Sequence, residues 1–180
     1  MTTSICSNFL LAGALLAASA TSATAAPAAA AAPPHLSRVH GLTFGTSIEM
    51  SAPAPAGLDA LLLVHPKDAR TGAERLSLTA VLFTKEALRD SGMKDAELLD
   101  YVKTTFLGST SAGTPADRTI LGRKVTGKAI EKKIPAPSRA EIYVVGTKKG
   151  GKVVLAFVFA PGFEKEAQEA IAEACSSMRD

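Results

Sequence analysis

Tryptophan, cysteine and histidine are scarce in this sequence of 180 residues, and each scarcity narrows the range of functions. There is no tryptophan, and only two cysteines and three histidines are present. His35, His40 and His65 stand apart, whereas a zinc site or a hydrolytic triad needs a histidine beside a second ligand or a nucleophile. We therefore expect neither a metal nor a cofactor.

Aromatic residues are also few, namely seven phenylalanines and two tyrosines. Proteins that bind single-stranded nucleic acid stack the bases on exposed aromatic side chains. Phe157 and Phe159 fall in a continuous apolar run and are expected to be buried. Nucleic acid is therefore not an expected partner.

Charged residues are absent before Arg38, and the start of that stretch is typical of a secretory signal peptide. Residues 9–18 form an apolar segment that suits a signal peptide and is too short to cross a bilayer, which takes about 20 residues. Ala-Thr-Ala at 23–25 matches a cleavage motif, so we predict cleavage near Ala25/Ala26 and a periplasmic or extracellular mature chain without a transmembrane helix. The alternative is a disordered, alanine-rich N-terminus.

The sequence predicts three parts. Residues 1–25 are the signal peptide, and residues 26–40 are an alanine- and proline-rich flexible tether. Residues 41–180 are expected to form a single domain. Cys6 would leave with the signal peptide, which excludes an internal disulfide bond.

Cys175 falls among apolar residues on one face of a predicted helix. This position indicates a small buried hydrophobic residue. A redox-sensitive thiol or an intermolecular disulfide bond is the alternative.

The first half of the predicted domain contains strands followed by helices. A weak strand at 42–50 precedes an apolar run at 58–64 that is typical of an interior strand, and the alternation from 75 to 82 indicates a half-buried strand. Helical spacing follows at 85–91 and 95–107, with Asp95 as the expected N-cap and Gly108 as the stop signal. We expect residues 109–117 to form a loop.

The second half predicts three strands and a terminal helix. The expected strands are 119–133, 139–147 and 152–160, and Lys148-Lys149-Gly150-Gly151 joins the last two as a hairpin turn. Residues 153–159 are apolar on both faces, which favours a central strand. An amphipathic helix spans 163–178. The fold class is therefore α+β: an antiparallel β-sheet with a mid-chain helix and a C-terminal amphipathic helix packed on it.

From residue 76 onward the order of elements resembles the PsbP-like α/β/α sandwich family and its bacterial periplasmic relatives. The resemblance depends on the strand-to-helix passage 76–106, on Leu-Gly-Arg-Lys-Val at 121–125, and on the ending that runs from Ile142 through a hairpin to the last helix. It implies a non-enzymatic protein that docks on larger assemblies, and it transfers no site residue.

Basic residues are concentrated in one region. Residues 118–152 hold ten basic and two acidic side chains, whereas the rest of the chain holds ten basic and fifteen acidic ones. On one strand, Lys124, Lys128 and Lys132 would point to the same side. With Lys148 and Lys149 they are the candidate residues for binding an anionic partner, such as an acidic protein or another component of the cell envelope. The alternative is that lysines protect a strand edge from pairing with other chains.

These observations favour an exported, non-enzymatic binding or assembly module. One alternative is a small hydrolase that uses His65 and Asp68 with Ser109 or Ser111. Another is a carrier of a small apolar ligand, for which a pocket of roughly 300 Å³ or more between sheet and helix is expected.

Overall fold

The computed structural model describes residues 35–50, 60–64, 75–132 and 137–180, which form eight strands and three helices. All of these residues belong to one compact unit, residues 32–180. The strands are β1 (His35–Val39), β2 (Leu42–Thr46), β3 (Ala60–Val64), β4 (Leu76–Phe83), β5 (Thr114–Ile120), β6 (Arg123–Lys132), β7 (Ser138–Gly146) and β8 (Lys152–Phe159). The helices are α1 (Lys85–Ser91), α2 (Asp95–Thr105) and α3 (Glu164–Ser177).

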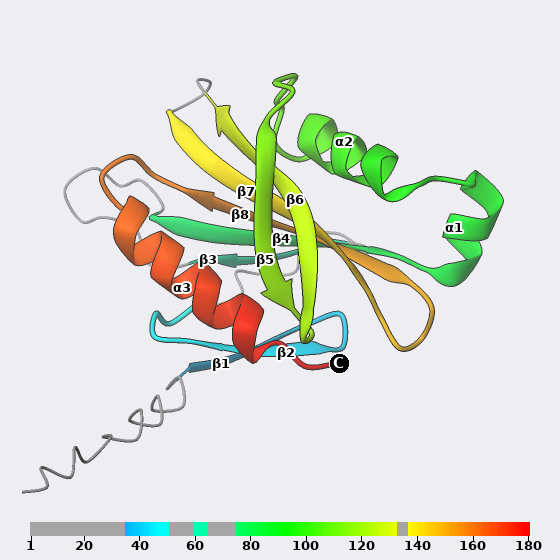
Figure 1. The fold of residues 1–180 in the computed structure, drawn as a ribbon, viewed down its shortest axis with the longest axis horizontal. Helices are drawn as coiled ribbons and strands as arrows, with labels where there is room; N and C mark the ends of the chain where they lie inside the picture. The colour runs from blue at the N-terminus through cyan, green and yellow to red at the C-terminus, as the bar shows by residue number, and fades with distance from the viewer. Residues whose placement is uncertain (1–34, 51–59, 65–74, 133–136) are drawn as a thin grey trace, which may run out of the picture. The chain divides into compact units, whose positions relative to one another are not determined.

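Six strands form one antiparallel sheet in the order β3-β4-β8-β7-β6-β5, and β1 and β2 form a separate hairpin. Helix α3 and the hairpin lie on one side of the sheet and α1 and α2 on the other (Figure 1). The predicted α+β class, with a mid-chain helix and a C-terminal helix on an antiparallel sheet, is confirmed.

Strand β8 is central because its side chains are apolar on both faces. Leu155 and Phe157 belong to the core under α3, whereas Val154 and Ala156 belong to the core under α2. The predicted central strand is therefore confirmed, and so is the hairpin turn before it. In that turn Thr147 N–H donates to the Gly151 carbonyl at 2.9 Å, and Gly150 has a φ of 82° that glycine adopts without strain.

The β1–β2 hairpin is held against the end of α3. Thr43 and Arg179 exchange two backbone hydrogen bonds of 2.8 Å, and Ser177 Oγ accepts from the Gly45 N–H at 2.9 Å. His40 Nε2 lies 3.1 Å from the Ala80 carbonyl oxygen. Strand β1 falls within residues 26–40, so its five residues are a paired strand and not a tether; the part of the predicted tether before residue 35 lies outside the described residues.

The largest correction concerns residues 109–133. Instead of a loop followed by one long strand, the chain forms β5 and β6, joined by a two-residue turn at Leu121-Gly122. Both turn residues have positive φ, 52° and 72°. Leucine rarely adopts this conformation. Such turns usually contain Asn-Gly, Asp-Gly or Gly-Gly, and here only Gly122 matches that pattern.

Two smaller corrections follow from hydrogen bonding. Lys94, not Asp95, is the N-cap of α2, and its N–H donates to the Glu97 carboxylate at 2.6 Å. Strand β3 is the first strand of the sheet, not an interior one, because an apolar run does not reveal how many strands pair with it. None of the helices in the described part of the chain is both long and apolar enough to span a membrane.

Candidate functional site

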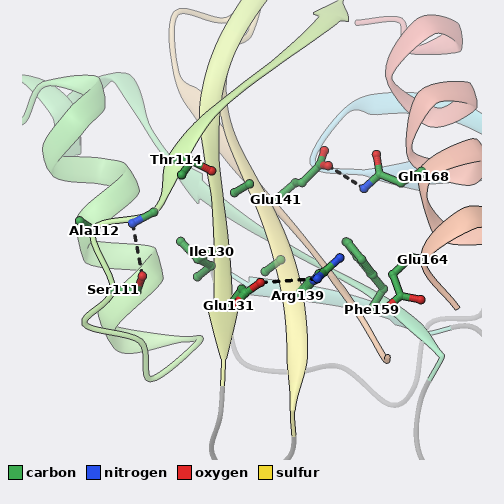
Figure 2. Close-up of a pocket in the computed structure, with 13 residues that line it drawn as sticks. Ser111, Ala112, Thr114, Ile130, Glu131, Arg139, Glu141, Phe159, Glu164 and Gln168 are labelled. Atoms are coloured by element: carbon green, nitrogen blue, oxygen red, sulfur yellow. Dashed lines mark hydrogen bonds and ion pairs between the residues drawn. The ribbon is translucent and has the colours of Figure 1, made fainter. Parts of the chain in front are cut away.

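A cleft of about 610 Å³ opens where β6 and β7 approach the loop before β5 and the first turns of α3. Figure 2 shows the side chains that line it. We call it the Glu141 cleft, and its lining residues are Ser111, Ala112, Gly113, Thr114, Ala129, Ile130, Glu131, Arg139, Ala140, Glu141, Phe159, Glu164 and Gln168.

The register of the strands leaves this end of the sheet open. The β5–β6 ladder begins at Thr114–Ala129, whereas β6 pairs with β7 as far as Lys132–Ser138, so the last part of β6 has no β5 beside it. Gly113 brings the chain into β5 with a φ of 71°. A Cβ at this position would lie 2.7 Å from Ile130 Cγ2 and 2.8 Å from the Ala129 carbonyl oxygen, so only glycine allows the loop to pack against β6.

A buried carboxylate forms one wall of the cleft. Glu141 is 7% exposed, and its side chain accepts four hydrogen bonds. Oε1 accepts from Arg118 Nη2 at 3.0 Å and Gln168 Nε2 at 2.7 Å; Oε2 accepts from Arg118 Nε at 3.1 Å and the Tyr143 hydroxyl at 2.5 Å. Each oxygen therefore has two donors, and the negative charge is compensated by a guanidinium.

The rest of the lining combines an apolar surface with charged side chains. Ile130 and Phe159 are buried core residues that reach the cleft. Glu131 pairs with Arg139 across 3.6 Å, and the Glu164 carboxylate accepts from the Gly162 N–H at 2.8 Å. The lining thus contains three carboxylates and one guanidinium. Arg118 compensates Glu141 and Arg139 pairs with Glu131, so the excess negative charge is that of Glu164, which favours a cationic or hydrogen-bond-donating group.

Two protonated groups lie behind the wall. Burial raises the pKa of the Tyr143 phenol, and its hydrogen bond to Glu141 raises that pKa further. Burial also raises the pKa of the Cys175 thiol to about 12. Cys175 therefore stays a thiol at neutral pH, and the predicted small buried hydrophobic residue agrees with its exposure of 1%.

The candidate lysines of β6 each have an acidic neighbour where the side chain is described. Lys124 Nζ lies 2.7 Å from Asp117 Oδ2, and Lys128 Nζ lies 2.9 Å from Asp100 Oδ1. Lys124, Lys128 and Lys132 share a face by strand alternation, although the side chain of Lys132 lies outside the described residues.

The other two candidate lysines stand in the β7–β8 turn. Lys148 contacts Asp180 through both its backbone N–H and its ammonium group. Lys149 is exposed. The count of charges along residues 118–152 did not reveal that Lys128 and Lys148 have acidic partners, because Asp100 and Asp180 lie outside that region.

The ion pairs of Lys128 and Lys124 lower the pKa of Asp100 and Asp117. Hydrogen bonds from Lys103 and then Lys128 hold the pKa of Asp100 below its ordinary value, and a hydrogen bond from Lys124 does the same for Asp117.

The residues of the hydrolase alternative do not form a constellation in the described part of the chain. His65 and Asp68 lie outside it. Ser109 is buried and its Oγ accepts from the Ser111 N–H at 3.3 Å, while Ser111 Oγ accepts from the Gly113 N–H at 3.3 Å. These local bonds shape the loop. Within the same described residues, no group of three or more His, Cys, Asp or Glu is placed to hold a metal ion.

Sequence reasoning did not select Glu141 or Arg118. The available signal is a glutamate between Ala140 and Ile142 in an apolar strand, at the alternate position to Tyr143. Such a residue points into the core and needs a cationic partner. The partner, 23 residues earlier, follows only once β5 is recognised.

No protein-family model matches this chain, and no curated protein matches it. Nine chains of solved structures match in fold. One is a crystal structure of a protein from Bacteroides thetaiotaomicron VPI-5482, with 13% sequence identity and a TM-score of 0.44, in which the match covers 77% of this chain and 44% of that one. This chain spans less than half the length of that neighbour, and the likeness carries no argument about function. The resemblance to the PsbP-like family stays a prediction.

Proposed function

We propose that this chain is a non-enzymatic binding module and that the Glu141 cleft is its ligand site. The main support is a cleft of about 610 Å³ with the Glu141 carboxylate in its wall, where that carboxylate accepts four hydrogen bonds from the protein itself. A volume of this size is typical of sites for small ligands.

The state of Glu141 supports binding over catalysis. A general base needs a free lone pair within reach of the proton that it removes. All four acceptor positions of Glu141 are occupied by Arg118, Tyr143 and Gln168. The carboxylate therefore fixes the shape of the wall, and it does not take up a proton from a ligand.

The lining indicates the chemistry of the ligand. Ile130, Phe159 and the neighbouring alanines offer an apolar surface, while Glu131 and Glu164 stand at the same cleft as exposed or half-buried carboxylates. The arrangement fits a small amphipathic molecule with an apolar body and a cationic or hydrogen-bond-donating group. This proposal takes up the carrier alternative, with a more polar ligand than the sequence suggested.

The test is a ligand screen read by NMR. The ¹⁵N-labelled protein is titrated with a library of small aliphatic and aromatic amines, and with the matching alcohols and carboxylic acids. We expect saturable chemical-shift changes at Thr114, Ile130 and Gln168, and we expect the amines to cause them at lower concentrations than the carboxylic acids. Ala112→Trp fills the mouth of the cleft, since Ala112 is exposed there, and should raise the Kd at least tenfold.

Ala87→Trp is the matched control. Ala87 is an exposed residue of α1 that does not line the cleft, and the same substitution there should leave the Kd within twofold. If no library member gives saturable shifts in the cleft, or if the two tryptophan variants bind equally, the cleft is not the ligand site.

We further propose export to the periplasm or the extracellular space. The apolar segment 9–18 and the Ala-Thr-Ala motif at 23–25 support it. N-terminal sequencing of the protein from cell fractions should find Ala26 as the first residue outside the cytoplasm. An uncleaved chain confined to the cytoplasm would contradict the proposal.

A further inference from the structure

The ladder between β6 and β7 is shorter than the strands themselves. Pairing runs from Lys132–Ser138 to Lys128–Ile142 and ends there. Strand β6 begins five residues earlier, at Arg123, and β7 continues to Gly146. Residues 123–126 and 144–146 therefore have no ladder between them, and Figure 1 shows the β5–β6 turn well away from the β7–β8 turn.

Strand alternation identifies the backbone groups that face this opening. Thr147 N–H bonds to Gly151 on the β8 side, so Val144 and Gly146, at alternate positions, direct their N–H and C=O groups away from β8. On β6, the two-residue turn makes Ile120–Arg123 the hydrogen-bonded pair, so Lys124 and Thr126 face away from β5. Both inner edges thus present ladder groups to the opening.

The opening is built into the fold. Gly127 presses so closely on β7 that a Cβ would lie 2.0 Å from the Ile142 carbonyl oxygen, and this contact marks the point of divergence. Beyond it, Ile120 and Val125 pack into the core under α3.

A cavity adjoins the opening on each side. One of about 320 Å³ is lined by residues of α2, β6 and β7, and one of about 750 Å³ by the two turns and the end of the chain. Their charged lining residues are Asp95, Arg123, Lys124, Lys148, Arg179 and Asp180. Four of the six are basic. Lys148 is bonded to Asp180 and Lys124 to Asp117, so the positive charge that favours an acidic occupant comes from Arg123 and Arg179.

We propose that the opening between β6 and β7 is a β-strand addition site, which takes an extended acidic peptide segment of about three or four residues. The peptide backbone pairs with Val144 and Gly146 on one side and with Lys124 and Thr126 on the other. Arg123 contacts the acidic side chains on one face of the peptide. The partner is a protein with an exposed acidic strand or tail, and this site is independent of the Glu141 cleft.

The test uses the ¹⁵N-labelled protein and the peptide Ac-Glu-Val-Glu-Val-Glu-NH₂. We expect saturable shifts of the amides of Val144, Gly146, Lys124 and Thr126. Two further peptides separate the contributions: one with lysine in place of glutamate, and one N-methylated at both valines, which loses the backbone donors along one of its two edges. Each should bind at least tenfold more weakly.

Gly146 offers a matched pair of variants. A Cβ there meets nothing within 4 Å, so Gly146→Ala should bind like the original protein. Gly146→Pro removes the N–H that faces the opening and leaves the β8 side of the ladder intact, so the Kd should rise at least tenfold. Arg123→Glu should also weaken binding, whereas Lys149→Glu, the same charge change outside both cavities, should not.

Several outcomes would overturn the proposal. They are the absence of binding at millimolar peptide, equal binding of the N-methylated peptide, or equal binding by the alanine and proline variants. A failure of the amine screen at the Glu141 cleft would leave this result unchanged, because the two sites share no lining residue.

Discussion

Arg118 on β5 reaches past β6 to hold Glu141 on β7, with Nε 3.1 Å from Oε2 and Nη2 3.0 Å from Oε1. β5 is separated from β7 by one strand in the sheet. Gln168 joins the same carboxylate from α3. A single buried ion pair thus connects two non-adjacent strands and the terminal helix, at the place where the sheet opens into the cleft.

Replacing Glu141 with glutamine tests this connection. Glu141→Gln keeps the shape of the side chain and removes the charge, which leaves the partly buried guanidinium of Arg118 without its counter-charge. Breaking a buried pair in this way costs about 3 kcal/mol or more in the free energy of unfolding. Urea denaturation followed by circular dichroism measures the loss.

Glu131→Gln is the matched control on the neighbouring strand. The Glu131 side chain is 71% exposed, and its pair with Arg139 spans 3.6 Å. Exposed pairs contribute about 0–1 kcal/mol, so the control should change stability little. Equal losses for the two variants would show that the Arg118–Glu141 pair has no special role.

The sequence predicted the parts of the fold that depend on local patterns. Helical spacing placed α1 and α2, the double-sided apolar run placed β8 at the centre, and Gly150 signalled its turn. It failed at β5, whose Thr-Pro-Ala-Asp-Arg start has mostly exposed residues and no apolar alternation. The turn after β5 depends on Leu121 at a positive φ, which is a tertiary effect.

The site was harder to predict than the fold. Both proposed binding regions lie where a β-ladder ends, at the pairs Thr114–Ala129 and Lys128–Ile142. The register of a ladder depends on how two strands pair, and it cannot be derived from the local pattern of either strand alone. Charge counting selected Lys128, but its partner Asp100 comes from a helix 28 residues away. Only the packing of α2 against β7 and β8 places the two together.

The pairing of Lys128 with Asp100 predicts a measurable titration. Because the hydrogen bonds lower the pKa of Asp100, its carboxyl group should titrate below the ordinary value of 3.8 in ¹³C NMR. Lys128→Met should move the midpoint upward, whereas Lys149→Met, on the turn, should not. The bonds stabilise the fold above the ordinary pKa, and this contribution is lost as the pH falls through the folded-state value. An unmoved midpoint in Lys128→Met would mean that Lys128 is free for a partner.

Gly127 is predicted to be the least replaceable glycine of the sheet. In Gly127→Ala the new methyl group would meet the Ile142 carbonyl oxygen and the ring of Tyr143, so either β6 or β7 must shift. Overpacking of this kind typically costs about 1–3 kcal/mol, and Gly127→Ala should lie at the upper end because backbone has to move. Gly146→Ala, with open space around its Cβ, should be neutral within about 0.5 kcal/mol. Thermal unfolding compares the two, and similar melting temperatures would contradict the close approach of β6 to β7.

Burial of two acidic groups predicts a loss of stability at alkaline pH. The pKa of the Cys175 thiol rises from 9.0 to about 12, and that of Tyr143 rises from its ordinary 10.0. Between these values the unfolded chain releases protons that the folded protein keeps, so the stabilisation present below pH 9 is lost as the pH rises toward 12. Each proton lowers the free energy of unfolding by about 1.4 kcal/mol per pH unit.

Urea denaturation at several pH values between 8 and 11 measures this slope. Cys175→Ala and Tyr143→Phe should each reduce it, whatever their effect on stability at pH 7. In a Cys6→Ser background, iodoacetamide should also leave the folded protein unmodified at pH 8 and alkylate Cys175 once the chain is unfolded in urea, because only the thiolate reacts. Rapid alkylation of the folded protein would contradict the burial of Cys175 and the direction of its pKa.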